Sequence, residues 1–172
     1  RSSPSIMGDL LLWQAGVLRD HGHKEEAFDV IVRRLDLLND GRTEVMETVD
    51  WMIHRQAWSL IDEVEKRFAA RMKGDAEFLY RLAEARIKQG REDAAQSLTR
   101  QALDVNKEDA SERKRLGVVL QNRGMFQWAQ REFRQAIEQA APGTIAHVEA
   151  HLYLSEMLHD QPDDMAAATV RQ

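Results

Sequence analysis

The stretches RLAEARIKQGREDAAQSLTRQAL (residues 81–103) and RLGVVLQNRGMFQWAQREFRQAI (residues 115–137) carry the same pattern of small residues. In each, a glycine follows one small residue by seven positions and precedes alanines by five and twelve positions. These glycines, Gly90 and Gly124, are 34 residues apart (124 − 90), and further steps of that length reach Gln56 and Gly22. Glycine adopts positive φ readily, so these positions predict tight turns between helices. At Gln56 we expect a turn that accepts other residues.

The apolar residues around each turn are spaced as on one face of a helix. Around Gly22 they recur every three or four positions, at Leu11, Ala15, Leu18, Ala27, Val30, Ile31 and Leu35. Each 34-residue unit is therefore expected to be two helices joined by a short turn. Small residues would let neighbouring helices approach closely, at Ala15, Ala27, Ala83, Ala95, Gly117 and Ala129.

A period of 34 residues with this layout resembles the tetratricopeptide repeat. The best match is residues 110–143, through Leu116, Gly117, Leu120, Gly124, Ala129, Phe133, Ala136 and Pro142. The resemblance covers nearly the whole chain as one repeat domain, residues 1–172, in units of about 8–41, 42–75, 76–109, 110–143 and 144–172. The second unit is degenerate and the last is partial. The resemblance implies an all-α, right-handed superhelical solenoid of about five helical hairpins, whose first helices line a concave groove.

Composition excludes several classes of protein. Of the 172 residues 43% are hydrophobic and 31% are charged, which is typical of a folded protein. No run of about 18 apolar residues is present, so we expect no membrane insertion. A net charge of −5 disfavours nucleic-acid binding, and the lack of cysteine excludes disulfides and thiolate sites. Arg1 in place of Met indicates a piece of a longer protein. The compartment therefore stays open, with the cytoplasm slightly favoured over an extracytoplasmic site whose signal or anchor was removed.

The resemblance predicts a groove surface on the first helices. Its partner-binding side chains are expected at Leu12, Trp13, Met46, Asp50, Tyr80, Arg81, Glu84, Lys88, Lys114, Arg115, Val118 and Asn122. The early part of this set is apolar and acidic, and the later part contains the basic residues. Such a surface suits a peptide or protein segment with an apolar anchor near Trp13 and an acidic section near the basic residues. The alternative interpretation is a solvated charged face.

Catalytic and metal-binding patterns are weak. His147 and His151 share one helix face, as in some zinc sites, but no third ligand is obvious. No nucleophile–base pair, phosphate-binding glycine loop or converging carboxylates appear, so we expect no enzyme activity, cofactor or metal.

The sequence therefore favours a non-catalytic protein-interaction module, a scaffold or adaptor. Two alternatives stay open. One is self-association through apolar residues at either end, at Ile6, Met7 and Leu10 or within residues 165–170. The other is the regulatory array of an enzyme whose catalytic domain lies outside the chain.

Overall fold

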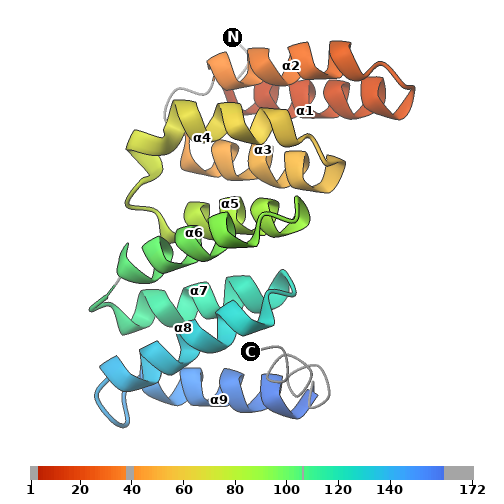
Figure 1. Ribbon diagram of the computed structural model, residues 1–172. Helices are drawn as coiled ribbons and strands as arrows, with labels where there is room; N and C mark the ends of the chain where they lie inside the picture. The colour runs from red at the N-terminus through yellow and green to blue at the C-terminus, as the bar shows by residue number, and fades with distance from the viewer. Residues whose placement is uncertain (1–3, 38–40, 106, 161–172) are drawn as a thin grey trace. The chain divides into compact units, whose positions relative to one another are not determined.

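The computed structural model describes residues 4–37, 41–105 and 107–160 (Figure 1). These residues form nine α-helices and no strand, which confirms the predicted all-α class. The helices are α1 (Pro4–Asp20), α2 (Lys24–Leu37), α3 (Arg42–Arg55), α4 (Trp58–Met72), α5 (Ala76–Lys88), α6 (Glu92–Val105), α7 (Ala110–Asn122), α8 (Phe126–Gln139) and α9 (Ile145–Asp160). The chain divides into two compact units, residues 1–98 and 99–172, with the boundary inside α6.

The turns inside the four helical hairpins have one hydrogen-bond pattern. The residue at each turn position donates its N–H to the carbonyl three residues earlier, and the next residue donates to the carbonyl five residues before itself. These N···O distances are 2.8 to 3.2 Å, and the pattern is a Schellman motif. The turn positions Gly22, Gly90 and Gly124 have φ of 86°, 73° and 76°, and Gln56 has φ of 55°. The turn at Gln56 does accept a residue other than glycine, as expected, but it is the same motif and holds Gln56 in the left-handed region.

Replacing Gln56 with glycine should stabilise the chain. A side chain with a Cβ is strained at positive φ, so we expect Gln56→Gly to raise the free energy of unfolding by about 1 kcal/mol. Urea titration followed by circular dichroism measures the change. Gln127→Gly, at an exposed position inside α8, is the matched control and should lower stability by up to about 1 kcal/mol. A loss at both positions would contradict the left-handed conformation of residue 56.

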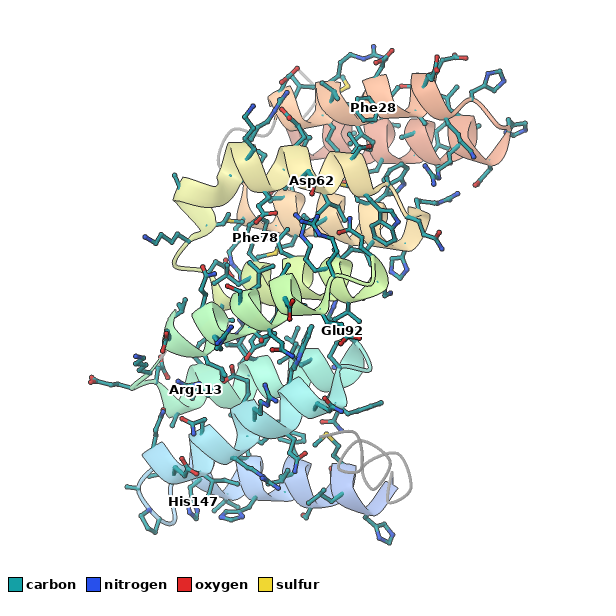
Figure 2. All side chains as sticks on the ribbon, viewed as in Figure 1. Phe28, Asp62, Phe78, Glu92, Arg113 and His147 are labelled. Carbon is teal, nitrogen blue, oxygen red and sulfur yellow. The ribbon has the colours of Figure 1, made fainter. Side chains whose placement is uncertain are left out.

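In unit 1 the first helices of successive hairpins pack in one row. Helix α3 contacts both α1 and α5, and α2 contacts α4 in a second row. Every residue of α5 from Ala76 to Arg86 is buried, including the aromatic ring of Phe78 (Figure 2). The predicted small positions Ala15 and Ala83 are fully buried. Their lack of bulk lets these helix backbones approach closely.

In unit 2 helix α8 packs against both α7 and α9, and α7 also contacts α9. Gly117 on α7 faces the ring of Phe133 on α8 so closely that a Cβ at residue 117 would lie 2.4 Å from the ring. That ring is fully buried and stacks on Tyr153 with ring centroids 5.7 Å apart. The prediction of a necessary small residue at position 117 is confirmed. The apolar residues within 165–170, one of the two predicted self-association sites, lie outside the described residues.

Candidate protein-interaction surface

The predicted groove residues of unit 1 come from three adjacent helices but differ in accessibility. Trp13 on α1 and Lys88 on α5 are exposed, and Leu12 and Asp50 are half-buried. The other four are buried, namely Met46, Tyr80, Arg81 and Glu84. Only the exposed and half-buried members of the predicted set are therefore accessible to a partner in unit 1. The largest apolar side chain among them is Trp13, which is 71% exposed.

The predicted residues of unit 2 all lie on α7. Arg115 and Asn122 are exposed, and Lys114 and Val118 are half-buried. Since these positions are three or four residues apart, or neighbours, α7 holds them near one side of the helix. Their continuity with the residues of unit 1 stays a prediction.

The basic groove residues of unit 1 already have carboxylate partners. Arg81 donates from Nε to Asp50 at 3.1 Å and from Nη1 to Glu77 at 2.7 Å. Lys88 Nζ lies 3.0 Å from a carboxylate oxygen of Glu84. Arg81 and Glu77 are shielded from water and Asp50 is half-buried, so these charges offset one another at short range. An acidic ligand would have to compete with bonds that the chain has already made.

The same holds on α7. Arg115 donates from Nε and Nη2 to both carboxylate oxygens of Glu112, each at 2.7 Å. Lys114 donates to Glu149 on α9. The positive charge predicted for the late part of the groove is therefore largely neutralised within the chain.

Ion pairs also connect successive repeats. Asp20 with Arg55, and Lys114 with Glu149, are each 35 residues apart, close to one repeat. The hydrogen bond from Arg55 lowers the pKa of the Asp20 carboxyl. The repeat pattern of small and apolar residues does not reveal these pairs. Opposite charges about one period apart were the signal that would have revealed them.

Hydrogen bonds from an arginine on α3 tie the first helix of the second hairpin to the start of the third. Arg42 bonds to Asp75, the N-cap of α5, and donates from Nη2 to Glu77 at 2.9 Å. These bonds raise the pKa of Arg42, the hydrogen bond to Asp75 being the largest cause. Arg42 therefore stays charged and holds the N-terminus of α5 against α3.

Helix α1 carries a second apolar surface, which we call the outer stripe. It consists of Ile6, Leu10, Trp13 and Val17, with Met7 beside it, and these side chains are 38 to 71% exposed. Their spacing of four, three and four residues places them along one line of the helix. The opposite face of α1 is buried, at Gly8, Leu11 and Ala15. A helix that is apolar on both faces is typical of one with partners on both sides. Trp13 is thus a member both of the predicted groove set and of this stripe, in which it lies next to Leu10.

Helix α9 also exposes apolar side chains, at Ile145, Val148 and Leu152. His147, labelled in Figure 2, lies edge-on to His151 with ring centroids 4.6 Å apart. Among residues 4–37, 41–105 and 107–160, no group of three or more histidine, aspartate or glutamate side chains could hold a metal ion. No helix in this described part is long and apolar enough to span a membrane.

Comparisons with known proteins give limited likeness. No protein-family model and no curated protein matches the chain. Two similar solved structures are the MamA RS-1 ArsTM double mutant and MamA 41-end from Desulfovibrio magneticus RS-1. Each aligns with a TM-score of 0.43 and 17% identity over 77% of this chain, and over 74% and 75% of the respective MamA chains. The chain's own helices and turns establish an all-α fold built from repeated helical hairpins.

Proposed function

We propose that the chain is a non-catalytic protein-interaction module of the tetratricopeptide type, a scaffold or adaptor. The supporting observation is the row of first helices in unit 1, where α3 contacts both α1 and α5. Equivalent positions of successive hairpins then form one extended face. Helical repeat proteins use such faces to bind extended or helical segments of other proteins.

The accessible side chains of this face favour an apolar ligand segment. Trp13 supplies a large exposed ring, with Leu12 beside it on the same helix. Arg81 and Lys88 are already paired with acidic residues of the chain. We therefore assign the anchoring contact to Trp13 and expect charged groups to adjust orientation and specificity. Buried aromatic anchors contribute most of the binding energy in many interfaces.

The groove is tested with peptides selected from a random-peptide display library on the immobilised chain. Trp13→Ala should weaken binding of a selected fluorescent peptide at least tenfold, because it removes the anchor. Fluorescence polarisation measures the affinity. Leu37→Ala, an exposed apolar position on α2 outside both the predicted groove set and α1, is the matched control and should leave binding unchanged.

Peptides that bind Trp13→Ala with unchanged affinity would contradict the anchor. If affinity also stayed the same in Lys88→Glu and Arg115→Glu variants, the groove proposal would have to be abandoned. Circular dichroism of each variant establishes that the helices are intact, so a loss of binding cannot come from unfolding.

A second candidate function is self-association. The outer stripe of α1 favours self-association, because its exposed apolar side chains follow one another along the helix. The largest of them, Trp13, is 71% exposed. Contiguous apolar patches of several hundred Å² mark interaction sites on soluble proteins.

A further inference from the structure

The outer stripe has the spacing of a coiled-coil seam. Ile6, Leu10, Trp13 and Val17 follow one another at intervals of four, three and four residues, as successive d, a, d and a positions of a heptad do. None of the four is charged, and they lie on the face of α1 opposite the buried Ala15. A helix packed along its whole length against this line would cover all four side chains.

We propose that the outer stripe docks on the same stripe of a second copy, with the two α1 helices antiparallel across a two-fold axis. The proposal rests on the self-association function named above and specifies its surface and geometry. It shares Trp13 with the groove, so the pairing and a peptide anchored on Trp13 exclude one another. A two-fold arrangement uses one patch twice, so it needs a surface that is complementary to itself.

The order of side chain sizes favours the antiparallel arrangement. With the axis between Leu10 and Trp13, the ring of Trp13 meets Leu10 of the other copy, and Ile6 meets Val17. The layer of Trp13 and Leu10 then combines a large side chain with a smaller one, and the layer of Ile6 and Val17 combines two of similar size. A parallel pair would place the two Trp13 rings in one layer, where they are too large for an ordinary two-stranded seam.

The charges of α1 do not oppose this pairing. Its charged residues are Asp9, Arg19 and Asp20, and none belongs to the stripe. Arg19 donates to the carbonyl of Arg55, and Asp20 forms an ion pair with the Arg55 side chain. In the antiparallel register Asp9 lies at the level of Gln14 of the other copy, so no like charges meet there.

The exposed area sets the expected strength. The five side chains of the stripe and its flank are 38 to 71% exposed, which gives on the order of 500 Å² of apolar surface per copy if each exposes roughly 200 Å² in full. A symmetrical pair would bury about 1,000 Å², near the lower limit for a specific interface. We therefore expect a weak, reversible dimer that forms as the protein concentration rises.

Sedimentation equilibrium of the full chain at several concentrations tests the pairing. The unmodified chain should shift from monomer to dimer, and Leu10→Glu and Val17→Glu should each remain monomeric at the highest concentration. Val148→Glu is the matched control, because Val148 is about as exposed as Leu10 (56% against 53%) but lies on α9. It should dimerise like the unmodified chain. A monomer at every concentration, or a dimer that survives both stripe variants, would overturn the proposal.

Cross-linking tests the direction of the helices, because the chain has no cysteine of its own. With a short bis-maleimide reagent, the double variant Ile6→Cys, Val17→Cys should give a covalent dimer, and each single variant should give little. Within one copy the two positions are about 16 Å apart along the helix, too far for the reagent. Cross-linking of either single variant would instead show a parallel pair and overturn the antiparallel geometry.

The dimer and groove proposals can fail separately. Leu10 and Val17 lie outside the predicted groove set, so Leu10→Glu should abolish the dimer and leave peptide binding unchanged when binding is measured below the concentration at which the chain dimerises. A chain that binds peptide and never dimerises overturns the two-fold pairing alone. A chain that dimerises through the stripe but binds no peptide overturns the groove alone.

Discussion

Arg113→Met should lower the free energy of unfolding by about 3–5 kcal/mol, the range measured when one partner of a buried ion pair is removed. Arg113 on α7 (Figure 2) is 2% exposed, and its partner Glu132 on α8 is fully buried. The guanidinium donates from Nη1 to Glu132 at 3.0 Å, from Nε to Gln139 at 3.1 Å and from Nη2 to the carbonyl of Leu103 at 2.8 Å. Without Arg113, the carboxylate of Glu132 is left in the core without this cation. Urea unfolding measures the loss.

Two further variants separate the charge effect from simple loss of packing. The double variant Arg113→Met, Glu132→Leu should recover most of the loss, because it removes both charges together. Arg34→Met is the matched control. Arg34 is also fully buried, but its partner Glu47 is exposed and can be solvated. Equal losses at the two arginines would contradict this explanation.

Arg34 differs from Arg113 in how well its guanidinium is satisfied. Its Nη1 has no hydrogen-bond partner in the described structure. Burial lowers the pKa of Arg34, although Glu47 opposes this shift. Burial therefore destabilises the charged form of Arg34. Because little stabilisation is lost with it, we expect the replacement of Arg34 by Met to change the free energy of unfolding by less than about 1 kcal/mol.

Gly117→Ala should destabilise the chain by roughly 1–3 kcal/mol, although alanine is the better helix former. The new Cβ would lie 2.4 Å from the ring of Phe133, which is fully buried and stacked on Tyr153. A ring held on both sides cannot move away without disturbing the packing of α8 on α9. Urea unfolding again measures the effect.

Gly16→Ala provides the matched control for this substitution. A Cβ at Gly16, inside α1, would meet Arg55 Nη2 at 3.6 Å, an ordinary contact. It should therefore stabilise the helix by up to about 1 kcal/mol. In the Gly117→Ala background, Phe133→Leu should cost less than it does alone, because the smaller side chain relieves the clash. Additive losses would show that the ring is not the cause.

The fold was predictable because its main signals are local. Short stretches of sequence, as around Gly90 and Gly124, contain both signals. One is a glycine where the turn needs positive φ, and the other is a set of apolar residues spaced by three and four positions. Residue 56 is not a glycine, yet Gln56 forms the same turn with positive φ. The packing of two helices outweighs a local conformational cost of about 1–2 kcal/mol. Local preference therefore predicted that a hairpin exists but not which residues its turn tolerates.

The candidate surface was less predictable because accessibility depends on neighbouring helices. Helical spacing placed Tyr80 and Glu84 on the expected side of α5, but it could not show that neighbouring elements bury them. The partners of Arg81 likewise include Asp50, 31 residues away. The spacing that aligns Trp13 with Leu10 is present in the sequence, but which face of α1 stays exposed depends on the packing of the other helices.

The position of the boundary inside α6 has a consequence for how the chain unfolds. Of the 14 residues of this helix, seven precede the boundary (92–98) and seven follow it (99–105). Helical segments of that length have little persistence of their own in water. If one compact unit unfolded, the half of α6 in the other unit would therefore lose the helical turns that continue it. Amide hydrogen exchange in α6 should then report the cooperativity of the whole chain, and a truncation at residue 98 would damage the fragment that it was meant to isolate.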